Sequence, residues 1–254
     1  MTTLMFYERA VPLNRKRHLK TKIEISPNHY AFAARTNALP IASTELNDAA
    51  RYYPIVFVGK EKGSFNIAAL VGLRNQENLM VNPDGVWEAG AYIPAFARRY
   101  PFVLAATNDQ DKFTVCVDEA YPGLSESKGT ALFDEDGAES AYLKGVLEFL
   151  QVFNREMQRT SAFANRMHEL GLLTPKTITV DRKGKKQFLE GLWVIDDAKL
   201  GGLDDARVPE LYRLGYLHWI SAHRISLGNL AGLATRLDEH SQLTDEKTTA
   251  EEPA

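Results

Sequence analysis

The sequence predicts an α+β fold in which an antiparallel, meandering β-rich N-terminal half packs with a helical C-terminal half containing one β-hairpin. In residues 22–134, short apolar runs are separated by turns rich in proline, glycine, asparagine and aspartate, which is typical of strands joined by short loops. Residues 135–237 instead carry long apolar stripes at helical spacing. A chain of 254 residues, 44% of them hydrophobic, can bury a full-sized core. We therefore expect one domain over residues 1–237 and a disordered polar tail over 238–254.

Proline and glycine divide the N-terminal half into short elements. Residues 1–22 are basic and irregular, and we expect them to form a solvated lead-in. The run PIVFV at 54–58 is apolar and β-branched, so it predicts a buried strand, and 65–73 resembles its hairpin partner. The other elements expected in this half are extended segments at 22–25, 30–34, 102–105 and 112–118, and short helices at 45–52 and from Pro94.

The longest element of the C-terminal half is expected to be a helix that ends at Gly171. Asp136 and Glu139 have capping-box spacing, and the apolar residues behind them recur at helical intervals over about thirty residues. Residues 176–181 and 186–195 flank a lysine- and glycine-containing turn and predict the β-hairpin. Two further helices are expected, one after Asp205 and one from Tyr216 to about Leu237.

Composition argues against several classes of protein and site. The 30 basic residues are interleaved with 33 acidic ones for a net charge of −3, which argues against a general electrostatic grip on nucleic acid or anionic lipid. The single cysteine, Cys116, excludes an intramolecular disulfide and any multi-cysteine metal site. No uncharged run approaches the ~20 residues that span a bilayer, and the N-terminus lacks the apolar stretch of a secretory signal. We expect a soluble, cytoplasmic protein without a cofactor, a nucleic-acid partner or membrane insertion.

Three residues are candidates for catalysis: Cys116, Asp118 and His223. In an extended segment Cys116 and Asp118 lie on the same face, and a neighbouring carboxylate opposes the low thiol pKa that a nucleophile needs. A buried, inert cysteine is therefore the favoured interpretation. His223 lies on an apolar stripe of the last predicted helix, which favours a core histidine satisfied by hydrogen bonds. A catalytic base or a pH switch is the alternative for this residue.

No motif in the sequence specifies a reaction or a metal site. The chain has no His-Glu-x-x-His, no Walker loop, no dinucleotide-binding glycine pattern and no Gly-x-Ser-x-Gly. The acidic run 133–137 has the glycine of a calcium loop, but Leu132 and Leu143 would occupy its first and last ligand positions. A leucine side chain supplies no oxygen ligand, so we expect no metal site.

The segment 92–123 supplies the candidate binding surface. Its members are Arg98, Arg99, Tyr100, Asp118 and Glu119. The planar fork of arginine favours two-point contacts with a carboxylate or a phosphate, so the arginines can hold an acidic ligand. The alternative is that both arginines pair internally with the two acids and hold a loop in place.

Several segments together carry a family resemblance. They are YPIVFV at 53–58, ALVGLRNQENL at 69–79, YIPAFARRYPF at 92–102, VCVDEAYPG at 115–123, ALFDEDG at 131–137, LEFL at 147–150, VIDDAKL at 194–200 and AHRISLGNL at 222–230. The chain resembles the SapC family of bacterial proteins from Val11 to Leu237. The family name comes from a gene set for a paracrystalline surface layer, so the resemblance implies association with a surface-layer or envelope system. It brings no catalytic residue to this chain.

We therefore expect a soluble bacterial accessory protein that binds a protein or peptide partner through the candidate binding surface. One alternative is an enzyme that modifies or hydrolyses a peptide or other small substrate. This alternative requires His223 to meet Cys116 or Asp118 in one concave pocket. The other alternative is a structural component of a surface layer, which requires the purified protein to assemble with itself.

Overall fold

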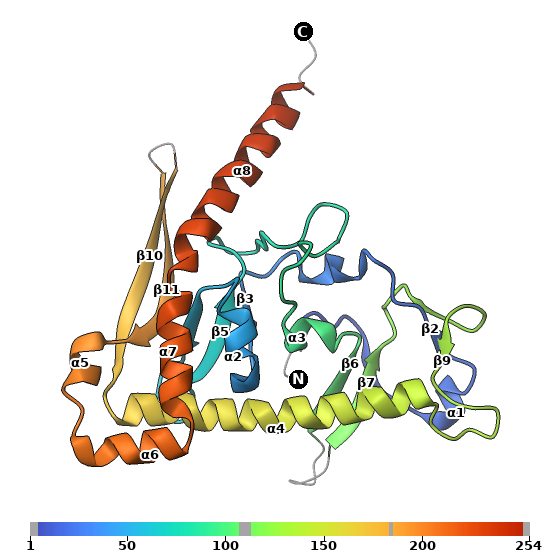
Figure 1. The fold of residues 1–254 in the computed structure, drawn as a ribbon. Coiled ribbons are helices and arrows are strands. Elements are labelled where there is room, and N and C mark those ends of the chain that lie inside the picture. Colours follow the sequence, from blue (N-terminus) through green and yellow to red (C-terminus); the bar gives the residue numbers. More distant parts are fainter. Residues whose placement is uncertain (1–4, 107–112, 183–184, 251–254) are drawn as a thin grey trace.

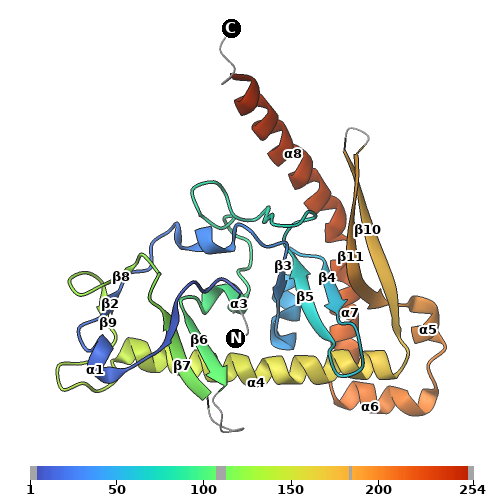
Figure 2. The same cartoon turned by 180° about the vertical axis from the view of Figure 1, so that it is seen from behind.

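The computed structural model describes residues 5–106, 113–182 and 185–250, and its longest element is the 29-residue helix α4 (Ala141–Glu169). Ser140 caps this helix by accepting a hydrogen bond from the Leu143 N–H. Gly171 follows its end in the left-handed conformation, with φ of 68°. Two antiparallel sheets stand side by side along α4 in both the front and the back views (Figure 1, Figure 2). The predicted α+β architecture is confirmed.

The larger sheet has five strands in the order β10-β11-β4-β5-β3. Its members are β3 (Ala38–Pro40), β4 (Ile55–Val58), β5 (Asn66–Leu70), β10 (Leu173–Arg182) and β11 (Lys185–Ile195). Val58 pairs with Asn66 in the hairpin of β4 and β5, and Trp193 of β11 pairs with Phe57 of β4. The two hairpins expected from the sequence are therefore joined in one sheet.

The smaller sheet has three strands in the order β1-β7-β6. They are β1 (Ala10–Pro12), β6 (Phe102–Ala106) and β7 (Phe113–Asp118), and residue 112, where the last strand was expected to begin, lies outside the described residues. Three very short strands, β2 (Lys22–Ile23), β8 (Leu124–Ser125) and β9 (Thr130–Ala131), form a third sheet near the start of α4 (Figure 1).

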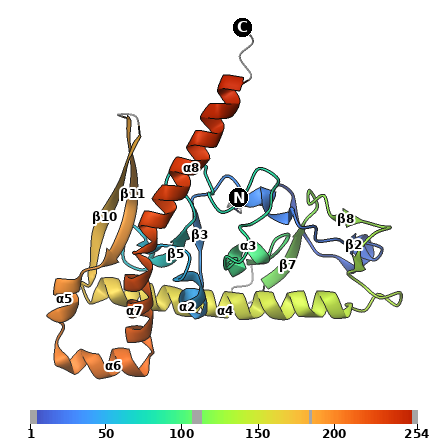
Figure 3. The same ribbon diagram turned by 45° about the horizontal axis from the view of Figure 1, so that its top comes forward.

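Short helices connect the sheets, and two longer ones lie on the larger sheet. The short helices are α1 (Arg15–His18), α2 (Leu46–Ala49), α3 (Ala95–Arg98), α5 (Asp197–Gly201) and α6 (Val208–Arg213), with 3-10 turns at η1 (His29–Ala33), η2 (Ser43–Glu45) and η3 (Asp205–Arg207). The longer ones are α7 (Tyr216–Ser226) and α8 (Asn229–Ala250). Figure 3 shows α8 rising away from the body beside the β10–β11 hairpin.

Helix α4 contributes side chains to two hydrophobic cores. In its first half, Leu143 and Leu150 pack in a core with Val117 of the three-stranded sheet. In its second half, Phe163 packs in a larger core with Phe57 of the five-stranded sheet. One face of one helix therefore stabilises both sheets, because burial of large apolar side chains contributes about 1.5–3 kcal/mol each.

Two local expectations in the first 140 residues are wrong. Residues 30–34 were expected to be extended, but they belong largely to the 3-10 helix η1, and the short strand β2 pairs with β8 and β9. The imidazole of His29 bonds the Tyr121 hydroxyl at 3.0 Å and the Tyr100 carbonyl at 3.1 Å, which holds this turn in place.

The capping box expected at Asp136 and Glu139 is also wrong. Both residues lie in a turn that precedes the helix, in which Gly137 has φ of 78° and Glu139 forms a β-bridge with Phe133. The helix begins only at Ala141, and its cap is a serine. The acidic residues with capping-box spacing correctly indicated a helix, but the predicted start of that helix was several residues too early.

The last helix begins at Tyr216 as expected, but it is interrupted and it ends later than expected. It is divided at Gly228 into α7 and α8, and at the start of α8 the Asn229 amide donates hydrogen bonds to the Ala50 carbonyl at 2.8 Å and the Tyr53 carbonyl at 3.2 Å. Helix α8 then continues to Ala250, so residues 238–250 of the expected polar tail are helical, and residues 251–254 of that tail lie outside the described residues.

Candidate functional site

The three candidate catalytic residues do not come together. Cys116 lies on β7 opposite Pro12 of β1 and Val103 of β6, in the smaller sheet. His223 lies on α7 and bonds the backbone of β4 and β11, in the larger sheet. Burial raises the pKa of the Cys116 thiol, which lowers its thiolate fraction and its reactivity. The meeting that the enzyme alternative requires does not occur.

His223 is a core histidine, as the sequence favoured. Its Nε2 accepts a hydrogen bond from the Ile195 N–H at 3.1 Å, and its Nδ1 therefore donates to the Ile55 carbonyl, 2.9 Å away. Burial lowers the pKa of this side chain to about 4, so the ring is neutral at pH 7. Because both ring nitrogens have backbone partners, neither is left to act as a base.

Asp118 holds the N-terminal segment against the smaller sheet. Its fully buried carboxylate accepts hydrogen bonds from the backbone N–H groups of Glu8 (3.0 Å), Arg9 (2.9 Å) and Ala120 (3.1 Å). The hydroxyl of Tyr100, itself buried, donates another at 3.2 Å. These donors satisfy the carboxylate. Asp118 and Tyr100 are therefore structural, and neither presents its polar group to a ligand.

Glu119 is paired with basic residues from the N-terminal segment. Its carboxylate contacts the Arg17 guanidinium at 2.6 Å, the His18 Nε2 at 3.2 Å and the Arg9 guanidinium at 3.4 Å. Internal pairing of this acid with Arg98 or Arg99, one of the two interpretations of the sequence, is therefore wrong. The basic lead-in, expected to be solvated, contains β1 and α1 and supplies the charges that neutralise Glu119.

Arg98 lies on the exposed side of α3. Its Nε donates to the Ile93 carbonyl at 2.9 Å, and its Nη2 donates to the Tyr92 hydroxyl at 3.3 Å. The guanidinium also lies 5.4 Å from the Phe149 ring centre. Arg98 is therefore held at the surface by neutral groups.

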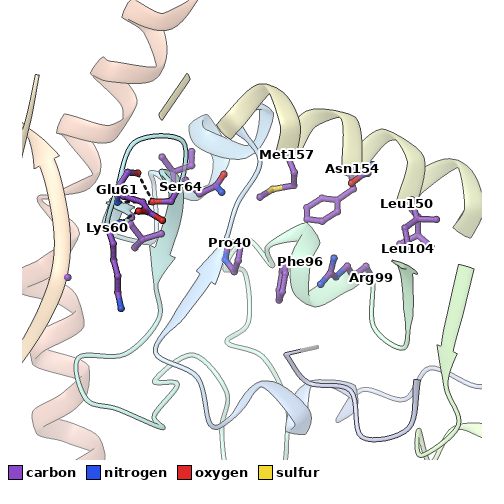
Figure 4. A pocket seen from close by; sticks show the side chains of 16 residues that line it. Pro40, Lys60, Glu61, Ser64, Phe96, Arg99, Leu104, Leu150, Asn154 and Met157 are labelled. Carbon is purple, nitrogen blue, oxygen red and sulfur yellow. Dashed lines mark hydrogen bonds between the residues drawn. The ribbon is translucent and has the colours of Figure 1, made fainter. Parts of the chain in front are cut away.

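A cleft of about 770 Å³ lies beneath α4, with walls from α3, α4 and both sheets (Figure 4). Its apolar lining includes Phe96 of α3, Phe153 and Met157 of α4, Ile67 of β5 and Leu104 of β6. Clefts of roughly 300–1,000 Å³ with apolar walls and a few polar groups are typical of small-ligand sites. The cleft is therefore the candidate functional site.

Arg99 is the charged residue in the apolar part of this cleft. Its guanidinium lies 3.9 Å from the Phe96 ring centre and 5.4 Å from that of Phe153, and Figure 4 shows Arg99 beside Phe96. Its Nε is buried and has no hydrogen-bond partner among the described residues. Burial lowers the pKa of Arg99, and only the nearby Tyr7 hydroxyl opposes that shift. No described carboxylate pairs with this cation.

Asn66 places a second unpartnered polar atom in the same cleft. Its side-chain Oδ1 is buried and accepts no hydrogen bond from a described residue, although its backbone pairs with Val58. Four buried side-chain atoms of the described residues lack partners, and two of them line this cleft. Buried polar groups normally have partners. One donor and one acceptor of the described lining are therefore without a protein partner in this cleft.

The sequence pointed to Arg99 but missed the rest of the cleft. Phe153 and Met157 belong to the apolar stripe of α4, and nothing in its period distinguishes a side chain that lines a cleft from one that packs in a core. Asn66 begins a strand at a position where a polar residue is ordinary. No local signal could have found it.

A second hollow, of about 940 Å³, lies on the other side of Leu104 and Asn154, which line both. Its lining includes the polar residues Glu139, Arg155 and Gln158. None of its described lining residues has a buried side-chain atom without a partner. It therefore carries no comparable sign of a ligand.

Metal and membrane sites were sought over residues 5–106, 113–182 and 185–250. In this part of the chain no three histidine, cysteine, aspartate or glutamate side chains lie close enough to hold a metal ion. Nor does any helix there have the length and apolar character needed to cross a membrane.

Comparison with known proteins gives one match. A family model described as SapC matches residues 13–233, which include α3, α4 and every residue that lines the cleft. No curated protein and no solved structure matches the chain. The family match therefore covers the cleft without specifying what it binds.

Proposed function

The chain belongs to the SapC family, and we propose that it is an accessory protein that binds a protein or peptide partner in the cleft beneath α4. The bound part is a short, extended, mainly apolar segment that places an acidic group at Arg99. The system in which it acts is a bacterial surface layer or envelope assembly, as the family resemblance implies.

The observation that carries this proposal is that the buried Nε of Arg99 has no acceptor and that its guanidinium has no carboxylate partner among the described residues. A buried N–H group without an acceptor, as at the Nε of Arg99, costs about 1–3 kcal/mol. Stacking on Phe96 offsets part of this cost. A ligand carboxylate that binds the guanidinium would remove the remaining free-energy cost. This is why we expect the cleft to bind an acidic group.

The unpaired oxygen of Asn66 favours a peptide over a simple acyl chain. A peptide backbone offers N–H donors as well as carbonyl acceptors, so one extended segment can satisfy both Asn66 and Arg99. A fatty acid offers acceptors only. The apolar side chains of such a segment would lie against Phe153 and Met157.

The same lining favours binding over chemistry. Ser64 is its only described hydroxyl group, and it donates to the Glu61 carbonyl at 2.7 Å while accepting from the N–H groups of Lys60 and Glu61. A serine nucleophile needs a neighbouring base to take its proton. Ser64 instead closes the β4–β5 turn.

The test is selection of short random peptides on the purified protein, followed by calorimetric titration of the selected peptides. Met157→Trp fills the cleft from α4 and is expected to weaken binding at least about tenfold, because the larger side chain occupies the ligand volume. Arg98→Gln is the matched control. It changes the neighbouring arginine outside the cleft and is expected to leave the Kd within about twofold.

Thermal unfolding of both variants shows whether each is folded before binding is compared. Peptides that bind wild type and Met157→Trp equally, with the variant folded, would place their site elsewhere and overturn the proposal. Failure to select any peptide that binds the wild-type protein contradicts it as well.

A further inference from the structure

We infer that Arg99 holds the C-terminal carboxylate of the bound segment, an inference that rests on the proposed function. The ligand class is then a peptide or protein with an apolar, free C-terminal end. Three features carry this inference: the segment anchored beside Arg99, the position of its guanidinium and the chemistry of the neighbouring side chains.

The N-terminal segment lies beside Arg99 and Phe96, next to the residues that line the cleft. The Phe6 ring packs on Phe96 with centroids 5.7 Å apart, and the Tyr7 hydroxyl interacts with Arg99 while donating to the Phe102 carbonyl at 2.7 Å. Asp118 fixes the next two backbone N–H groups. With this segment anchored beside the guanidinium, the end of a chain fits there better than a chain that continues past it.

The guanidinium is fixed for recognition of a planar anion. Its position over Phe96 and near Phe153 restrains its plane, and restraint before binding reduces the entropy lost when a ligand is held. A carboxylate can accept two parallel hydrogen bonds from the edge of an arginine fork. A carbonyl within a chain offers a single neutral oxygen, and an amide end offers no charge.

The side chains near Arg99 set the preference for the last residues of the ligand. Phe153, Leu104 and Leu150 supply apolar walls, and Met157 supplies a flexible one. A methionine can adjust to different apolar shapes, so we expect several apolar terminal residues to be accepted. A charged terminal side chain would lose its hydration without a partner there.

The test compares one selected peptide in two forms, with a free C-terminal carboxylate and with a C-terminal amide. On the wild-type protein the acid is expected to bind about tenfold more tightly or better, the usual effect of a charge-assisted hydrogen bond. On Arg99→Gln this ratio is expected to fall to about one, whereas Arg98→Gln keeps it. The ratio of acid to amide affinity on the wild-type protein is measured without any variant. The inference can therefore be tested even if Arg99→Gln does not fold.

Each outcome separates this inference from the proposed function. Equal binding of acid and amide by the wild type, with both lost in Met157→Trp, overturns the C-terminal inference and leaves the proposed function standing. A preference for the acid that persists in folded Arg99→Gln overturns the role of Arg99. Decanoate is the third probe: if it binds in the cleft and no peptide does, a free acyl carboxylate is the ligand and both proposals fail.

Discussion

Asp118 is fully buried, Arg99 is half-buried with its Nε out of contact with solvent, and the surroundings of the two charged groups differ. The carboxylate of Asp118 is met by donors from three backbone groups and one hydroxyl, whereas the Nε of Arg99 meets no acceptor. A buried charge whose hydrogen bonds are all made stabilises the fold, because removing any one partner leaves a buried polar group unpaired and lowers the free energy of unfolding. We propose that the unsatisfied one in the cleft is completed by a ligand.

Asp118→Asn is expected to lower the free energy of unfolding by about 2–4 kcal/mol. The amide removes the charge and turns one acceptor into a donor that faces backbone N–H groups. Urea unfolding measures the change. Glu119→Gln is the matched control, with an expected loss of less than about 1 kcal/mol, because its arginine partners are largely exposed. Equal losses in the two variants would contradict the role given to Asp118.

The stability of the protein is expected to fall as the pH decreases from about 6.5 to about 4, in part through His223. Its pKa is about 4 in the folded protein and about 6.5 in the unfolded chain, so in this window only the unfolded chain binds the proton. The full contribution is present above pH 6.5, and the loss approaches about 3 kcal/mol near pH 4. Urea unfolding across this range compares wild type with His223→Gln, which cannot titrate. Parallel pH profiles would show that His223 does not contribute.

At the scale of elements, the ends of helices depend on contacts that are distant in sequence. Helix α4 begins where a serine caps it, and α8 begins where Asn229 reaches the end of α2. The asparagine amide bridges two carbonyls, of Ala50 and Tyr53. Because α8 otherwise rises away from the body (Figure 3), this contact and its first apolar turns fix its direction.

Asn229→Ala is therefore expected to lower the free energy of unfolding by about 1–2 kcal/mol, since it leaves the two carbonyls without their donor. Faster hydrogen exchange of the α8 amides is expected with it. Thr235→Ala is the control on the same helix: its hydroxyl bonds only the Ala231 carbonyl, and alanine favours the helix. Unchanged exchange in Asn229→Ala would show that α8 is held by its apolar face alone.

At the scale of the molecule, α4 connects the two sheets through their separate cores. Leu143 lies in the core of the smaller sheet, whereas the three tryptophans of the chain, Trp87, Trp193 and Trp219, all lie in or against the core of the larger one. This separation allows the prediction of one domain to be tested, because tryptophan fluorescence reports only on the core of the larger sheet.

Leu143→Ala is expected to shift the unfolding midpoint measured by tryptophan fluorescence, with a loss of about 2–5 kcal/mol. The substitution lies at the end of α4 away from the tryptophans, so it can move their transition only if both cores unfold together. Far-ultraviolet circular dichroism is the matching global signal. A tryptophan transition that stays at its wild-type midpoint while circular dichroism shifts would indicate two independent units.

The sequence by itself determined the features that depend on local pattern. The apolar period over α4, the two hairpins and the core position of His223 could all be read from residues a few positions apart, because periodicity reports which face of an element is buried. Membership of the SapC family could also be predicted from the sequence, because it depends on the order of characteristic segments along the chain.

Tertiary structure alone decided which residues meet. One interpretation of the sequence paired Asp118 and Glu119 with the arginines of their own segment. In the structure Glu119 pairs with basic residues among the first eighteen of the chain, and Asp118 accepts hydrogen bonds both from that N-terminal segment and from neighbours in its own. Arg99 instead lines an open cleft. The physical reason is that the charge and polarity of a side chain determine what kind of partner it needs. Strand order and register determine which group, distant in sequence, lies close enough to be that partner. The cleft exists only because two sheets were placed on one helix.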